Sequence, residues 1–77
     1  MKYIIFENAV GLKFPIIFPL VLEHVQIARN IRGTPKSAGF CRFDENKVIC
    51  YGESTSLNLH VDVADEDIIN KEFNREG

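Results

Sequence analysis

The side chains best suited to redox, nucleophilic or metal chemistry in this sequence are two cysteines and two histidines. Cys41 and Cys50 flank a short polar turn, and we expect two reduced core residues, with a disulfide or redox role as the alternative. His24 and His60 lack the spacing of metal ligands, and no serine lies in a nucleophile-elbow pattern. The sequence therefore predicts no catalytic residue, no metal site and no cofactor.

A cluster of basic and small polar residues is a better candidate for a binding site. Arg29, Arg32, Lys36 and Arg42 are four of the nine basic side chains, and residues 24–43 contain no Asp or Glu. Two polar loops, at residues 32–39 and 51–56, add backbone N–H groups and hydroxyls, which proteins combine with Arg or Lys to hold phosphate. The alternative is that both loops are ordinary turns and that Arg29 and Arg32 only complete a helix, whose dipole favours cations there.

Two aromatic side chains extend this candidate site. Phe40 and Tyr51 are predicted to face each other across a hairpin, where they could stack a base. The predicted phosphate- and base-binding residues are Arg32, Gly33, Thr34, Lys36, Ser37, Phe40, Arg42, Tyr51, Ser54, Thr55 and Ser56.

The elements that position these residues follow from the apolar pattern. Residues 2–7 and 12–18 are rich in Ile and Phe and predict a β-hairpin that is apolar, and therefore covered, on both faces. Pro15 cannot donate a ladder hydrogen bond, so the second strand is expected to lie at an edge or to be bulged there. A helix is predicted after Pro19, with Gly33 as its terminator. Its expected buried stripe consists of Leu20, Val21, His24, Ile27, Ala28 and Ile31.

A second hairpin, residues 38–43 and 48–53, has a predictable register. If Glu45 and Asn46 form a two-residue turn, Cys41 lies directly opposite Cys50, and Arg42 opposite Ile49. Residues 38–39 then approach residues 52–53, so the two polar loops are expected to lie close together.

The segment from residue 62 predicts a final helix with an acidic first turn, which the helix dipole favours. Asp62 is its expected cap, Asp65 its third position, and Ile68, Ile69 and Phe73 its buried stripe. The order of elements is ββαββα: two β-hairpins and two helices in a single α+β domain of residues 1–77.

Composition limits the classes of function. The 77 residues carry a net charge of −2, which argues against general nucleic-acid binding. The longest apolar run, residues 14–22, is too short to span a membrane and lacks the basic leader of a secretion signal, so we expect a cytoplasmic protein. Apolar residues on both faces of short elements favour self-association, and we expect a homo-oligomer.

Three segments resemble a group of small phage and prophage proteins: SAGFC at residues 37–41, CYGESTSL at 50–57 and the acidic helix ending DEDIINKEF at 65–73. The similarity covers roughly residues 37–73. Ala64 stands where that group usually has proline, and Tyr51 where a larger aromatic is common. The resemblance implies an accessory phage gene, expressed in the cytoplasm of an infected bacterium, and it implies context more than mechanism.

Some very small oligomeric phage proteins counter host defence by sequestering cyclic nucleotide signals between their subunits. We therefore predict a non-enzymatic binding protein that sequesters a cyclic nucleotide or a related phosphorylated signal at a subunit interface. One alternative is an inhibitor or adaptor that contacts a host protein through Asp65, Glu66 and Asp67. Others are a structural or virion-associated oligomer subunit and a thiol enzyme.

Overall fold

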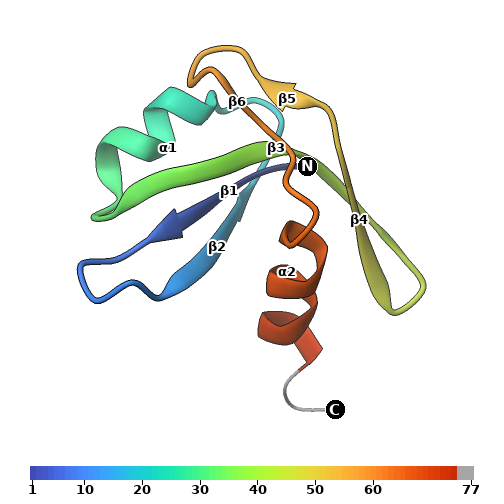
Figure 1. The fold of residues 1–77 in the computed structure, drawn as a ribbon. Coiled ribbons are helices and arrows are strands. Elements are labelled where there is room, and N and C mark those ends of the chain that lie inside the picture. Colours follow the sequence, from blue (N-terminus) through green and yellow to red (C-terminus); the bar gives the residue numbers. More distant parts are fainter. Residues whose placement is uncertain (75–77) are drawn as a thin grey trace.

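A four-stranded antiparallel sheet lies at the centre of the computed structural model, which describes residues 1–74 (Figure 1). Its strands are β1 (Lys2–Glu7), β2 (Lys13–Phe18), β3 (Thr34–Asp44) and β4 (Lys47–Tyr51), in the order β2-β1-β3-β4. The helices are α1 (His24–Asn30) and α2 (Asp65–Asn74), and β5 (Glu53–Ser54) pairs with β6 (Leu59–His60). The α+β class is confirmed, and the predicted order holds with two short strands added before α2.

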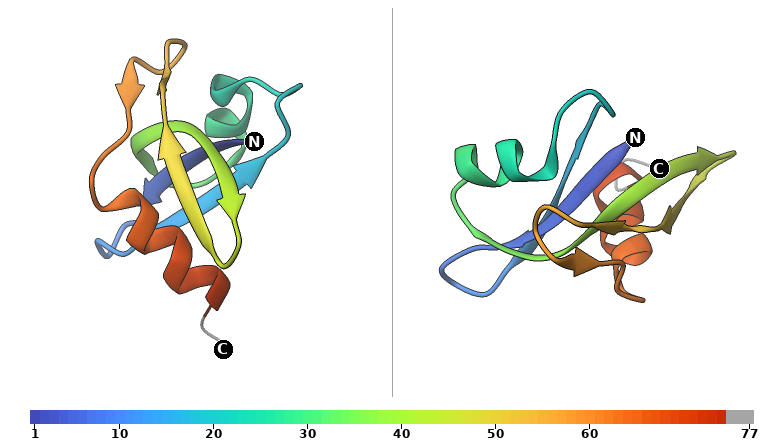
Figure 2. Two further views of the ribbon diagram at one scale, coloured as in Figure 1. Left: turned by 90° about the vertical axis from the view of Figure 1, so that its right-hand side faces the viewer. Right: turned by 90° about the horizontal axis from the view of Figure 1, so that it is seen from above.

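Both faces of the sheet are covered at β1, as the apolar pattern of this strand predicted. Ile4 and Phe6 belong to a core cluster that includes Ile27 of α1, while Tyr3 and Ile5 belong to a second cluster with Ile69 of α2. The helices therefore lie on opposite sides of the sheet (Figure 2). Residues 2–6, in the middle of this arrangement, are all buried.

The β1–β2 hairpin and its edge position are also confirmed. Asn8 closes the turn, because its side-chain oxygen accepts hydrogen bonds from the backbone of Val10 and Leu12, both 3.0 Å long. Gly11 in this turn has φ +87°, a conformation that glycine adopts without strain. Pro15 lies opposite Ile5 in β2, which is an edge strand of the sheet.

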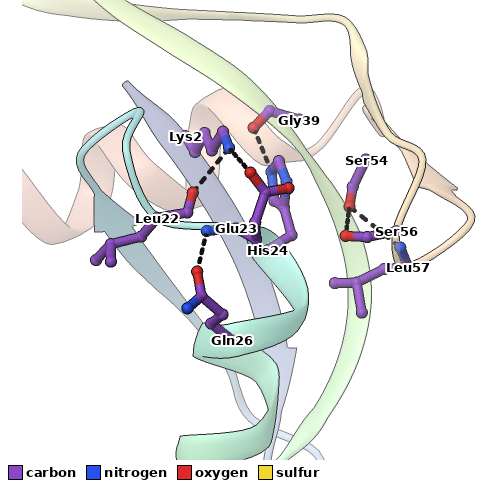
Figure 3. Close-up of polar contacts among 9 residues, drawn as sticks. All are labelled: Lys2, Leu22, Glu23, His24, Gln26, Gly39, Ser54, Ser56 and Leu57. Carbon is purple, nitrogen blue, oxygen red and sulfur yellow. Dashed lines mark hydrogen bonds and ion pairs between the residues drawn. The ribbon is translucent and has the colours of Figure 1, made fainter.

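Helix α1 is shorter than predicted at both ends. Its start is defined by Gln26, whose side-chain oxygen accepts a 2.7 Å hydrogen bond from the backbone N–H of Glu23 (Figure 3). Leu20 and Val21 therefore precede the helix and are 58% and 85% exposed, so their assignment to the buried stripe was wrong. The helix ends at Asn30, before the predicted terminator at residue 33.

Helix α2 begins at Asp65, which was predicted to be its third position, and it buries a narrower stripe than expected. Asp62 precedes the helix and its carboxylate accepts a 2.9 Å hydrogen bond from the backbone of Ala64. Ile69 is fully buried, whereas Phe73 is 55% exposed and packs edge-on against Phe43. The predicted burial of Phe73 was therefore wrong, because the helix passes the end of the core before reaching it.

Polar side chains of α2 also cover the outer edge of β4. Glu66 accepts a 2.9 Å hydrogen bond from the backbone N–H of Cys50, and Asn70 accepts a 3.1 Å bond from that of Val48. These groups lie four residues apart on one helix face and occupy donors that an exposed edge strand would offer to another chain. At these two positions, β4 is therefore closed to strand addition.

Candidate functional site

The β3–β4 hairpin has the register predicted from its turn. Cys41 pairs with Cys50, and Phe40 pairs with Tyr51. The rings of Phe40 and Tyr51 stack, with centroids 5.9 Å apart and planes 21° from parallel. Arg42 follows Phe40 on the same face because side chains alternate along a strand. We call Phe40, Arg42, Ile49 and Tyr51, which share this face, the aromatic platform.

The aromatic platform lies beyond the part of the sheet that α1 covers. Ala38, on the same face of β3, is buried in the core cluster beneath α1. Two residues later Phe40 is only partly buried, and Tyr51 is 47% exposed. Figures 1 and 2 show the hairpin projecting on the side of the molecule away from α1. The platform is therefore open to solvent while its inner edge is packed.

Two glycines permit the close packing at this inner edge. A Cβ atom on Gly52 would lie 2.9 Å from the Phe40 ring, and the backbone there has φ +77°. A Cβ atom on Gly39 would lie 2.8 Å from the carbonyl oxygen of Tyr51. These contacts confirm that residues 38–39 and 52–53 lie close together.

A buried histidine supports the platform from α1. The Nε2 atom of His24 lies 2.9 Å from the carbonyl oxygen of Gly39, and since a carbonyl only accepts, Nε2 carries the proton (Figure 3). The His24 ring meets those of Phe18 and Phe40 edge-on. The predicted burial of His24 is confirmed, and its contacts indicate that it positions Phe40.

The lysine of β1 ties the start of α1 to the sheet beside this histidine. The Lys2 ammonium donates a 2.7 Å hydrogen bond to the carbonyl oxygen of Leu22 and lies 3.5 Å from the Glu23 carboxylate (Figure 3). Its side chain is only 10% exposed. Lys2 is therefore committed to the fold, and Arg42 is the cation that the platform presents to solvent.

Arg42 is exposed, and no ion pair involves it within residues 1–74. The next pair on the same face, Asp44 and Lys47, places opposite charges across from each other. Arg42 therefore combines an unpaired guanidinium with adjacent aromatic rings. A planar group carrying a phosphate matches this combination, because rings stack and guanidinium groups bind phosphate oxygens in pairs.

The first part of the predicted basic loop lies elsewhere. Residues from Thr34 onward form β3, in which Thr34 pairs with Glu7, and Lys36 lies 3.9 Å from the Glu7 carboxylate. Thr34 and Phe40 are six strand residues apart, which corresponds to about 20 Å. Arg32 and Gly33 line a separate cavity of about 290 Å³ with the turn at residues 8–10. The expectation that both polar loops form one site is therefore wrong for residues 32–36, whereas residues 38–39 lie beside residues 52–53 as expected.

The other predicted hydroxyl residues, Ser37, Ser54, Thr55 and Ser56, divide into two buried and two exposed side chains. Ser37 is buried and donates a 2.6 Å hydrogen bond to Asp65. Ser54 is buried as well, and its hydroxyl accepts a hydrogen bond from the backbone of Leu57 (Figure 3). Thr55 and Ser56 are exposed in the following turn. Ser54 and Thr55 line a cavity of about 170 Å³ between β5 and β6, together with His60, which is exposed.

A buried polar network around Asp65 was missed by sequence reasoning. Asp65 is 1% exposed and accepts hydrogen bonds from the hydroxyls of Tyr3, at 2.5 Å, and Ser37, at 2.6 Å. Burial, followed by the hydrogen bond and charge of Asp65, raises the pKa of Tyr3 well above its usual value. The alternation of apolar residues in β1 placed Tyr3 on the second face but gave no sign of its partner.

This network gives structural roles to two of the three acidic residues at the start of α2, which are Asp65, Glu66 and Asp67. Asp65 binds two buried hydroxyls, and Glu66 binds the backbone of β4, so both carboxylates are used within the fold. Asp67 is exposed. The cluster is consequently a weaker candidate for a protein-contact surface than its sequence suggested.

Comparison with protein-family models, curated proteins and solved structures finds no match to this chain. Within residues 1–74 no group of three or more His, Cys, Asp or Glu side chains is placed to hold a metal ion. The described helices are also too short and too polar to cross a membrane. The site must therefore be interpreted from its own geometry.

Proposed function

We propose that this chain is a non-enzymatic binding protein that sequesters a phosphorylated nucleotide on the aromatic platform. The base stacks on the exposed ring of Tyr51, and the guanidinium of Arg42 holds a phosphate. The observation that carries this proposal is the stacked Phe40–Tyr51 pair with an exposed arginine on the same open face.

The energies of these contacts suit a small ligand. Stacking of a base on an aromatic side chain contributes about 1–3 kcal/mol, and a hydrogen bond to a charged group contributes about 1.5–3 kcal/mol. Phe40 and Ile49 are partly buried, so they give Tyr51 a firm apolar support. The net charge of −2 disfavours long nucleic acids, whose affinity depends on many cations.

The openness of the platform supports binding between subunits. Small-molecule sites usually enclose most of the ligand surface, and one flat pair of strands leaves one side of a stacked base in water. A second copy of the chain would cover that side and supply a second Arg42 for a ligand with two phosphates. This arrangement agrees with the oligomer and the cyclic nucleotide signal expected from the sequence and from its resemblance to phage proteins.

Binding measurements on matched variants test the proposal. Cyclic di- and trinucleotides and ADP-ribose derivatives would be titrated calorimetrically into the wild type, Tyr51→Ala, Arg42→Ala and Arg32→Ala. Tyr51→Ala should weaken binding by about 5- to 150-fold, and Arg42→Ala by about 10- to 150-fold. Arg32→Ala is the matched control, since Arg32 is also exposed but lies beside the β1–β2 turn.

Two results would contradict the proposal. One is that no nucleotide in the panel binds to the wild type. The other is that Arg32→Ala weakens binding as much as Arg42→Ala. Circular dichroism of each variant confirms folding, which these exposed positions should leave intact.

A further inference from the structure

The two cysteines occupy a special position in the sheet. Cys41 and Cys50 are directly opposite each other on neighbouring antiparallel strands. Both side chains point to the α2 face, where they pack with Tyr3 in one core cluster. The pair lies one rung from Phe40 and Tyr51 but on the other face of the sheet, so a bond between the sulfurs leaves the platform open.

Backbone hydrogen bonds show which kind of ladder pair this is. Cys41 exchanges backbone hydrogen bonds with Met1, so its N–H and C=O groups point toward β1. The N–H group of Cys50 points the other way, to Glu66. The two cysteines are therefore a non-hydrogen-bonded pair, in which Cα atoms are typically about 4.5 Å apart. That separation lies within the range of about 4.4–6.8 Å found in disulfides.

We propose that Cys41 and Cys50 form a reversible cross-strand disulfide by thiol–disulfide exchange with a small oxidant of the oxidised-glutathione class. The first thiolate attacks one sulfur of the oxidant, forms a mixed disulfide and releases one reduced thiol. The second cysteine thiolate then attacks the protein sulfur of that mixed disulfide and releases the second reduced thiol. In total the protein loses two protons and two electrons, and the oxidant gains both as two thiols.

Exposure assigns the order of these steps. Cys41 is fully buried, whereas Cys50 is partly exposed at the edge strand. A soluble oxidant therefore reaches Cys50 first, and Cys41 resolves the mixed disulfide from inside. Because Cys41 lies directly across the ladder, resolution requires no rearrangement of the strands.

The surroundings of Cys50 make exchange slow at neutral pH. Burial raises the pKa of the Cys50 thiol to about 12, and the charges of Cys41, Asp65 and Glu66 act in the same direction. The hydroxyl of Tyr3 opposes this shift through a hydrogen bond. Since the thiolate is the reactive form, the exchange rate should increase about tenfold per pH unit between pH 7 and 10.

The experiment treats the folded protein with excess oxidised glutathione at pH 8 and pH 9 and follows intact mass after an acid quench. The wild-type monomer should lose the mass of its two thiol hydrogens, about tenfold faster at pH 9. Dithiothreitol should reverse the change. Cys41→Ala should instead retain one glutathione on Cys50, and Cys50→Ala should stay unmodified because Cys41 is buried.

Several outcomes would overturn the inference. These are a lasting glutathione adduct on the wild type, a disulfide-linked dimer, or internal oxidation that occurs only in urea. An unreactive folded wild type would overturn it too. If Cys41→Ala fails to fold, the time course of the wild type decides. A transient mixed disulfide that converts to the oxidised monomer supports the inference. Oxidation without a detectable mixed disulfide refutes the order of steps.

Discussion

Replacing Asp65 with alanine should be among the most damaging single changes in this chain. Its carboxylate lies within the protein and accepts hydrogen bonds from Tyr3, Ser37 and the backbone N–H of Asp62. Among the described residues every buried side-chain polar atom has a hydrogen-bond partner. Asp65→Ala would remove the carboxylate acceptor of two buried hydroxyls, those of Tyr3 and Ser37.

The expected loss is large compared with the stability of so small a domain. Each buried donor left unsatisfied costs about 1–3 kcal/mol, so two hydroxyls give about 2–6 kcal/mol. At about 0.05–0.15 kcal/mol per residue, 77 residues have a free energy of unfolding of about 4–12 kcal/mol. The variant should therefore lose about half of its stability.

Urea unfolding followed by circular dichroism measures this loss. Asp67→Ala is the matched control, because Asp67 is exposed in the same helical turn and loses only its interaction with the helix dipole, about 0.3–1 kcal/mol. Tyr3→Phe, alone and combined with Asp65→Ala, should show a coupling energy of about 0.5–3 kcal/mol. If Asp65→Ala cost no more than Asp67→Ala, the interpretation of this network would be refuted.

Three further predictions concern the packing of the sheet. The raised pKa of Tyr3 means that this residue ionises first in the unfolded chain, so its contribution to the free energy of unfolding should fall by about 1.4 kcal/mol per pH unit above pH 10. Tyr3→Phe should remove this part of the slope, and urea titrations that show the same slope in the variant would contradict the prediction. Gly39→Ala should destabilise by about 1–3 kcal/mol, since its methyl group meets the Tyr51 carbonyl, and an unchanged melting temperature would refute that contact. Glu66→Ala should accelerate hydrogen exchange of the Cys50 amide, because it removes the carboxylate that accepts the hydrogen bond of this amide. An exchange rate equal to that of the wild type would contradict this contact.

Features governed by local rules could be predicted from the sequence. The two-residue turn at Glu45 and Asn46, with alternating side chains on either side, gave the register that pairs Phe40 with Tyr51. Pro15 predicted an edge strand because it lacks a backbone donor. In both cases the deciding chemistry lies within a few residues of the feature itself.

Features that depend on distant partners could not be predicted. Residues 34–37 look like a polar loop, but they pair with β1 and extend β3 to eleven residues. That pairing separates Arg32 from the platform, which changes the membership of the candidate site. The role of Asp65 likewise depends on Tyr3, 62 positions away in the chain. Local propensity carries no information about contacts of this range.

Nuclear magnetic resonance titration of the ¹⁵N-labelled protein with the same nucleotide panel would test the proposed binding site most directly. We predict that a binding nucleotide shifts the amide signals of Phe40, Arg42, Ile49 and Tyr51, and that Tyr51→Ala removes these shifts. Shifts confined to residues 32–36 or to the turn at residues 55–58, or no shifts with any nucleotide, would contradict binding on the aromatic platform.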